Sequence, residues 1–88
     1  MAREIDRWSE EDYYRQLARF IRADIESGEI APGTALPSEA HYMQEFGLAR
    51  NTCRQALALL RQWGYIETVK RRGSRVLPPS SWRRDEGS

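Results

Sequence analysis

The stretch from Arg50 to Trp63, RNTCRQALALLRQW, constrains this chain more than any other because it has the periodicity of one amphipathic helix. At about 100° per residue, one side of that helix carries apolar residues, namely Cys53, Ala56, Leu57 and Leu60. One flank of the apolar stripe carries Arg50, Arg54 and Arg61. The far side carries Asn51, Gln55, Ala58 and Gln62, and no acid. Taken alone, the pattern indicates a core helix with a solvated basic face.

Length and composition limit the chain to one small domain. It has 88 residues, of which 40% are hydrophobic, enough for one modest core and too few for an enzyme with a deep pocket. No apolar run is long enough to span a membrane, and the charged start is not a signal peptide. A single cysteine excludes an internal disulfide and fits a reducing compartment, so we expect a cytoplasmic protein.

The charges are segregated along the chain although the net charge is only +1. Residues 1–49 hold ten acids and five bases, a balance of −5, whereas residues 50–88 hold nine bases and three acids, a balance of +6. This asymmetry favours a polyanionic partner for the second half of the chain. Chance segregation on a small surface is the alternative that charge alone leaves open.

The first half predicts a first helix over about 10–27. Ser9 followed by three acids is typical of an N-cap and a first turn, and Gly28 can take the left-handed conformation of a C-cap. The apolar stripe of this helix is Tyr14, Leu17, Ala18, Ile21 and Ile25. Residues 1–8 lack any period, so we expect a flexible, frayed terminus there.

A short helix and a turn are expected directly before the basic stretch. Residues 28–37 form a connection, in which Ala35 and Leu36 could make a very short strand. Ser38 then caps a second helix that ends at Gly47. A short helix, a turn that starts at glycine and a longer helix form a helix-turn-helix, which we place at about 39–58.

The last third predicts a β-hairpin with a basic tip. Residues 65–69 and 74–77 read as two strands, joined by a turn over Lys70–Gly73, and Pro78 stops the second strand. We expect residues 79–88 to be a flexible tail, apart from Trp82. The expected fold class is therefore α+β, mainly α: three helices followed by a two-stranded wing, in a domain over 9–78.

Three motifs in the right order and spacing carry a resemblance to a known family. They are S-G-x-x-x-P-G at 27–33, L-P-S-E at 36–39 and R-x-T-x-R-x-A-L at 50–57, supported by glycines at 47, 64 and 73. Each motif is weak by itself, but together they resemble the winged-helix DNA-binding domain of GntR-family bacterial transcription regulators. The resemblance covers about residues 11–76.

The resemblance implies roles for individual residues. In the family, the arginines that match Arg50 and Arg54 contact the operator, and the position of Thr52 contacts phosphate or base. The serine that matches Ser38 caps the second helix near the DNA backbone, and the glycine that matches Gly73 lets the wing tip approach the minor groove. An arginine fork suits guanine, and the polar face around it suits bases and phosphates. The expected DNA-binding set is Ser38, Arg50, Asn51, Thr52, Arg54, Gln55, Lys70, Arg71, Arg72 and Gly73.

The family pattern is not matched everywhere. Ala40 stands where an arginine is usual, and His41 stands where a glutamate would complete a capping box. Ala49 replaces the usual serine or threonine before the recognition helix, so that helix lacks a side-chain cap. Arg71 replaces the first of two wing glycines. We infer that part of the electrostatic contact moves from the second helix to the wing.

These features together predict a bacterial transcriptional regulator, a repressor more readily than an activator, that binds double-stranded DNA. Two copies on a palindromic operator are expected, with no membrane partner, no cofactor, no metal and no catalytic residues. No effector site is visible, although GntR regulators usually carry a C-terminal effector domain. We expect a stand-alone winged helix rather than the excised half of a longer regulator. The rival function is a protein–protein adaptor, with an enzyme a distant third.

Several single residues have an ordinary explanation that we prefer. We expect His41 to be a solvated or phosphate-facing residue rather than a metal ligand, and Cys53 to be a buried, inert thiol. The aromatic residues Tyr13, Tyr14, Trp63 and Tyr65 are expected in the core and at its rim rather than as a base-stacking platform. Trp8 and Trp82 flank the domain, and the choice between packing on it and a dimer interface stays open.

Overall fold

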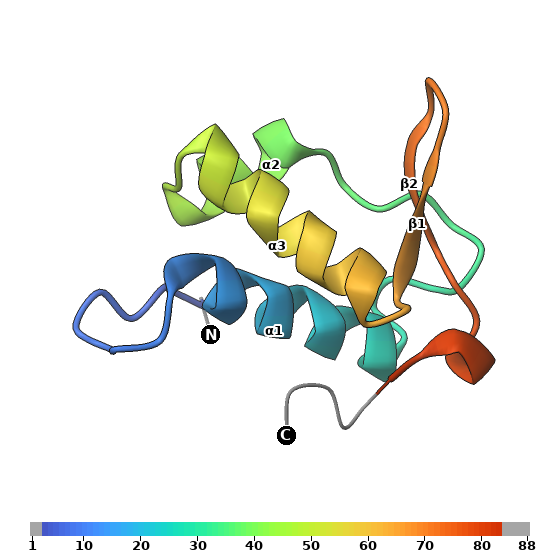
Figure 1. Ribbon diagram of the computed structural model, residues 1–88, viewed down its shortest axis with the longest axis horizontal. Coiled ribbons are helices and arrows are strands. Elements are labelled where there is room, and N and C mark those ends of the chain that lie inside the picture. Colours follow the sequence, from blue (N-terminus) through green and yellow to red (C-terminus); the bar gives the residue numbers. More distant parts are fainter. Residues whose placement is uncertain (1–2, 84–88) are drawn as a thin grey trace.

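Two crossing helices form the centre of the molecule in the computed structural model, which describes residues 3–83 (Figure 1). Helix α1 (Tyr13–Ser27) packs against helix α3 (Arg50–Gln62), and the short helix α2 (Glu39–Phe46) covers α3 from the other side. The expected apolar stripes meet here, because Leu17, Ala18, Ile21 and Ile25 share one core cluster with Cys53, Ala56, Leu57 and Leu60. The periodicity of both helices therefore predicted the core correctly.

The helix-turn-helix is built by local capping. The Ser38 hydroxyl accepts a hydrogen bond from the His41 amide at 3.2 Å, and this bond starts α2 as predicted. Gly47 ends α2 in the left-handed conformation with a φ of 65°. Ala49 precedes α3 without any side-chain capping bond, as its side chain requires. Residues 47–49 thus form the turn that joins the two helices.

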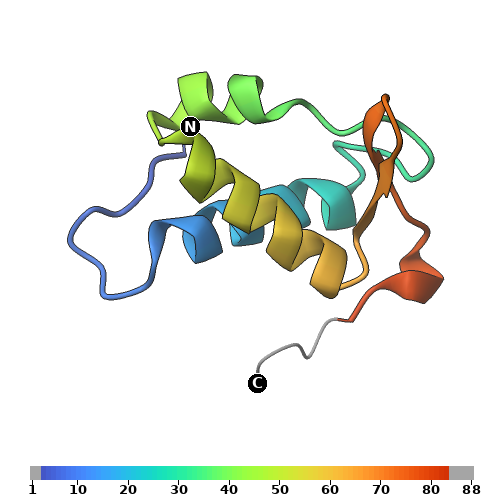
Figure 2. The ribbon, with the colours of Figure 1, turned by 45° about the horizontal axis from the view of Figure 1, so that its top comes forward.

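The hairpin projects from the helices at the opposite end of the molecule from the 46–49 turn (Figures 1 and 2). Strands β1 (Ile66–Val69) and β2 (Gly73–Val76) are antiparallel, with Ile66 opposite Val76 and Val69 opposite Gly73. The short strand expected at 35–36 is a single bridge from Ala35 to Arg75. Ile66 and Val76 are buried and fasten the base of the hairpin to the helices. The predicted α+β fold, three helices and a two-stranded wing, is confirmed.

The start of the first helix was predicted wrongly. Helix α1 begins at Tyr13 rather than near residue 10, and the Ser9 hydroxyl accepts from the Glu11 amide within a turn instead of capping a helix. The buried Gln16 side chain explains the difference, because it bonds the backbone of Asp6 and of Glu11. Those bonds hold residues 6–11 as a loop, so the acids that follow Ser9 precede the helix.

The chain before this loop is also packed, contrary to the expected frayed terminus at 1–8. Ile5 is buried in the core cluster, and Arg3 forms an ion pair with Asp24 at 2.8 Å. Arg7 donates to the Phe46 carbonyl at 3.1 Å, next to the helix-turn-helix. Residues 3–7 therefore bind to α1 and α2 through long-range contacts, while residues 1–2 lie outside the described residues.

The chain after the wing folds back instead of forming the expected loose tail. Residues Pro79–Ser81 form a short 3-10 helix, η1, and the Trp82 ring stacks on Tyr65 with centroids 5.0 Å apart. The Arg83 amide then donates to the Trp63 carbonyl at 2.8 Å, at the end of α3. Residues 78–83 thus form a strap over the end of α3, and the rest of the expected tail, 84–88, lies outside the described residues.

Candidate nucleic-acid interface

The exposed face of α3 carries the two arginines that the sequence singled out. Arg50 and Arg54 lie one helical turn apart, and their side chains are 59% and 60% exposed. Burial of the apolar stripe beside them fixes the rotation of the helix; the stripe consists of Cys53, Ala56, Leu57 and Leu60. Because the core holds that apolar side, both guanidinium groups are directed outwards.

A groove between α2, α3 and the hairpin gathers several of the predicted site residues. Its walls include Ser38 and Glu39 from the start of α2, Arg50 and Arg61 from α3, and Arg72 and Gly73 from the hairpin. Within residues 3–83, Arg61 and Arg72 make no ion pair, so both charges are free to face a ligand. The groove is therefore a basic channel that joins the basic helix to the wing.

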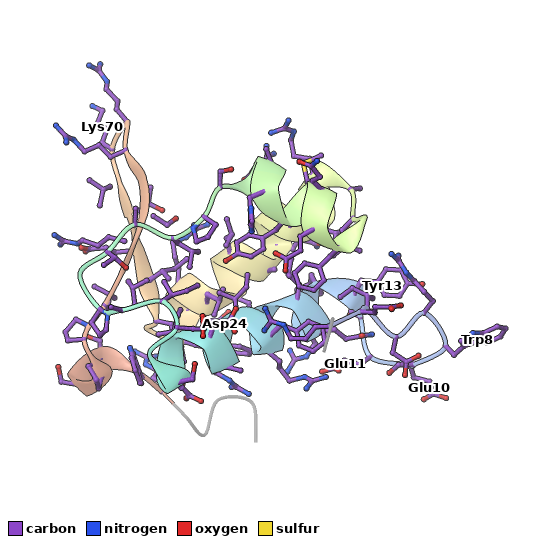
Figure 3. All side chains as sticks on the ribbon, turned by 180° about the vertical axis from the view of Figure 1, so that it is seen from behind. Trp8, Glu10, Glu11, Tyr13, Asp24 and Lys70 are labelled. Carbon is purple, nitrogen blue, oxygen red and sulfur yellow. The ribbon has the colours of Figure 1, made fainter. Side chains whose placement is uncertain are left out.

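The wing tip adds further positive charge. Lys70, Arg71 and Arg72 are exposed, and Lys70 marks the far end of the hairpin (Figure 3). The Arg72 amide donates to the Val69 carbonyl at 2.9 Å and closes the turn, with Arg71 at a φ of 67°. Arg75, further down the hairpin, is paired with Glu67 across the strands. The uncompensated charge of the wing thus lies at its tip.

Glu39 is a residue of this face that the sequence did not reveal. Its carboxylate lies 3.4 Å from Nη1 of Arg50 and 3.5 Å from Nε of Arg54, so that one acid bridges both arginines. The glutamate was read only as a favourable acid in the first turn of the second helix. Its contacts reach 11 and 15 residues along the chain, and no local spacing indicates such contacts.

The remaining helix residues of the predicted site lie elsewhere on α3. Thr52 and Gln55 line a second groove on the opposite flank, facing residues 9–14, which are the end of the loop before α1 and the first residues of α1. Asn51 is exposed and lies outside both grooves. The structure therefore brings Ser38, Arg50, Arg72 and Gly73 together in one channel, links Arg54 to it through Glu39, and separates Thr52 and Gln55 from it.

The other titratable candidates have structural roles. The exposed His41 imidazole lies 3.0 Å from the Glu45 carboxylate, one turn along α2. Cys53 is fully buried; this burial raises the pKa of its thiol, and the Glu39 carboxylate raises that pKa further. Burial also raises the pKa of the Tyr42 hydroxyl, which has no hydrogen-bond partner within the described residues 3–83. Among residues 3–83 no three acids, histidines or cysteines are grouped so that they could hold a metal ion.

The aromatic residues divide as expected between core and surface. Trp63 and Tyr65 are buried, and Trp82 packs on Tyr65. Trp8, for which the sequence left the choice open, does not pack on the domain: it is 97% exposed at the end of the molecule opposite Lys70 (Figure 3). No helix in the described part of the chain is long and apolar enough to cross a membrane.

Comparison with known proteins places this geometry in a family. Residues 13–76 match the model of the bacterial regulatory proteins of the gntR family. The chain is 44% identical over 63 residues to the mannosyl-D-glycerate transport/metabolism system repressor MngR of Escherichia coli K12. It is 39% identical over 66 residues to the transcriptional repressor NagR of Bacillus subtilis 168. These matches cover 72% and 75% of this chain but only 26% and 27% of the two relatives, so the chain spans about a quarter of their length.

Solved structures agree with the sequence relatives. The DNA-binding domain of AraR, crystallised with its operator ORX1, superposes with a TM-score of 0.73 at 33% identity, over 81% of this chain and 88% of that one. YtrA from Sulfolobus acidocaldarius, a GntR-family transcription factor, superposes with a TM-score of 0.78 at 31% identity, over 89% and 82% of the two chains. Fold, motifs and relatives agree that the chain belongs to the GntR family of bacterial regulatory proteins.

Proposed function

We propose that this chain binds operator DNA sequence-specifically and acts in a bacterium as a transcriptional repressor. The observation that carries the proposal is the exposed pair Arg50 and Arg54 on α3, beside the channel that leads to the basic wing tip. An arginine fork can bond two acceptors of one guanine, and free cations beside it attract phosphates without regard to sequence. A face of this kind combines base readout with backbone binding.

The dimensions of the elements support a docking mode. An α-helix with its side chains is about 10–12 Å across and fits the B-DNA major groove, which is about 12 Å wide. In this mode α3 enters the major groove, with Arg50, Asn51 and Arg54 towards the bases and Ser38 and Thr52 towards phosphates. The wing tip, Lys70 to Gly73, reaches the neighbouring minor groove or backbone. Gln55 lies on the flank that faces residues 9–14, away from the basic channel, so its contact would be with the base edges farthest from the wing.

The names of similar proteins support the biological role. MngR and NagR are repressors, and the AraR domain was crystallised with operator DNA. We propose that two copies bind a palindromic operator in the cytoplasm, because a two-fold arrangement of protein matches the symmetry of such a site. The adaptor function is less favoured, since the α3 face offers arginine and amide side chains rather than the aromatic or aliphatic anchors of a protein interface.

Selection of bound sequences from a pool of random duplexes tests the proposal. We expect enrichment of one motif that contains guanine and has two-fold symmetry. Binding of the whole pool without enrichment would leave only a non-specific DNA-binding protein. Absence of binding would contradict the proposal altogether and favour the function of a protein–protein adaptor.

A further inference from the structure

Two short stretches of chain connect the wing to the rest of the fold. Residues 63–65 lead from α3 into β1, and Leu77 follows the end of β2. Among the described residues the sheet has two strands, and a hairpin of that size needs support from other elements to be stable. The direction of the wing relative to α3 therefore depends on what holds its base.

One edge of the wing is held by the connection before α2. The Leu36 amide donates to the Ser74 carbonyl and the Val76 amide donates to the Thr34 carbonyl, both at 2.9 Å. These bonds run along β2, whereas the outer edge of β1 has no neighbouring strand within residues 3–83. Because a support along one edge acts as a hinge, the angle of the wing needs a second fixed point.

Tyr65, directly before β1, supplies that second point. Its side chain is fully buried, and its hydroxyl donates to the Glu26 carboxylate on α1. Its amide donates to the Leu60 carbonyl of α3 at 3.0 Å, and its carbonyl accepts from the Leu77 amide at 2.8 Å. Tyr65 thus joins both long helices to the two stretches at the base of the wing.

The strap packs directly on this junction. The Trp82 ring stacks on Tyr65 with an angle of 23° between the ring planes, and its Nε1 atom donates to the Leu77 carbonyl at 2.9 Å. The Arg83 amide bonds the Trp63 carbonyl beside it. The strap lies at the base of the hairpin, at the opposite end from the wing tip (Figure 1). Trp82 therefore contacts both the stretch that enters the wing and the stretch that leaves it.

We infer that Trp82 is a positioning residue that fixes the angle between the wing and α3, so that the wing tip reaches the DNA backbone while α3 occupies the major groove. The inference rests on the proposed function. A strand of this length spans roughly 14 Å, so a tilt of about 15° at the base moves the tip by roughly 3–4 Å. A hydrogen bond to phosphate, about 2.7–3.2 Å long, does not survive such a displacement.

Loss of the Trp82 stack should consequently uncouple the two parts of the DNA-binding face. Helix α3 still reaches the bases, but the wing has to be ordered at the moment of binding, and this cost offsets the attraction of its cations. The contribution of Arg72 to affinity then falls. A residue that only stabilised the fold would lower the folded fraction and would leave the contribution of Arg72 unchanged.

Three variants test this role. Trp82→Leu keeps an apolar side chain on the core, so that the domain stays folded, but removes the stack and the indole N–H. Trp82→Phe keeps an aromatic ring on Tyr65. Ile21→Val is the control, because it removes one methylene from a buried side chain in the middle of α1. Each is combined with Arg72→Ala, fluorescence anisotropy with the selected operator at about 50 mM salt measures affinity, and urea denaturation measures stability.

The expected result is a change in the cost of Arg72→Ala. That substitution should weaken binding about 3–10-fold in the unmodified protein, in Trp82→Phe and in Ile21→Val, but less than about 2-fold in Trp82→Leu. An equal cost in Trp82→Leu and Ile21→Val would overturn the inference. Equally small costs in Trp82→Phe and Trp82→Leu would overturn the role of the ring stack.

Backbone amide relaxation of the DNA-free protein gives a second readout that does not depend on binding. Trp82→Leu should lower the order parameters of residues 66–69 and 74–76 from about 0.85 to below about 0.6 and leave those of α3 unchanged. Rigid strands in Trp82→Leu would contradict the inference. Failure of the proposed function is distinguishable, because the unmodified protein would then show no preference for any selected duplex over random DNA, whatever the relaxation result.

Discussion

Glu39 at the start of α2 places its Oε1 atom 3.4 Å from Nη1 of Arg50 at the start of α3. The same carboxylate reaches Arg54 through its other oxygen. An exposed ion pair contributes little to stability, but it can restrict where two flexible guanidinium groups lie. Glu39 therefore holds the two arginines that we assign to base readout in one arrangement.

Replacing Glu39 by glutamine should reduce discrimination between operator and random duplex by up to about 1 kcal/mol, in keeping with an exposed charge pair. The affinity for the random duplex should stay the same or rise, because one negative charge is lost beside two cations. Competition binding with both duplexes measures the ratio. Glu45→Gln is the control, since that acid lies on the same helix but pairs with His41. A lower affinity for the random duplex, with unchanged discrimination between operator and random duplex, would contradict the positioning role of Glu39.

Ala49 leaves the start of α3 without a side-chain cap, although its backbone has the extended conformation of an N-cap. Ala49→Ser should raise the free energy of unfolding by about 1 kcal/mol and slow amide exchange over residues 50–53. Ala58→Ser, on the exposed middle of the same helix, should lower that free energy by up to about 0.5 kcal/mol. Urea denaturation of both variants checks the difference, and an equal effect at the two positions would count against a missing cap.

Arg71 adopts a φ of 67°, a conformation that favours glycine. Arg71→Gly should raise the free energy of unfolding by about 0.5–1 kcal/mol and weaken binding to all DNA, since one cation is lost. Arg72→Gly removes the same charge where φ is not positive, so it should weaken DNA binding similarly but destabilise the fold. Urea denaturation of the two variants measures the effect of backbone conformation on stability. Salt titration of their DNA binding measures the effect of the lost charge. A loss of stability in both would mean that Arg71 is not strained.

The strap over residues 78–83 depends on Gly64. A Cβ atom at that position would lie 2.0 Å from the Ser81 carbonyl oxygen, and φ is 82°. Gly64→Ala should therefore lower the free energy of unfolding by about 2–4 kcal/mol, through the backbone conformation and the clash together. Gly28→Ala carries only the first penalty, about 1 kcal/mol, because open space surrounds that glycine. Similar losses in the two variants, measured by urea denaturation, would mean that the strap does not press on Gly64.

The helices and the wing could be predicted because their signals are local. The apolar period of α3, the Ser38 cap and the glycines at 28 and 47 each act within a few residues. The failures came from contacts between distant parts of the chain. Arg3 meets Asp24, 21 residues away, and Arg7 meets Phe46, 39 residues away, and neither contact has a period that a sequence can display. Ser9 failed for a different reason, because a serine before acids can close a turn as well as cap a helix.

For the candidate site, the sequence predicted which side of α3 carries the arginines but not how the other candidate residues are arranged around them. The helical period places Arg50 and Arg54 on one side of α3, as observed. It could not reveal that Glu39 bridges them, or that the loop before α1 turns Thr52 and Gln55 into one wall of an acidic groove. Both features depend on how other elements pack against the recognition helix, and helical periodicity does not report that packing.

The most direct test of base readout by α3 is the ratio of operator to random affinity in Arg50→Ala and Arg54→Ala. Each variant should lose roughly 1–3 kcal/mol of discrimination, because a bidentate contact to one base is removed. Arg72→Ala, at the wing tip, should weaken binding to both duplexes alike and leave the ratio unchanged. A ratio that stays the same in both helix variants would contradict the assignment of Arg50 and Arg54 to sequence recognition.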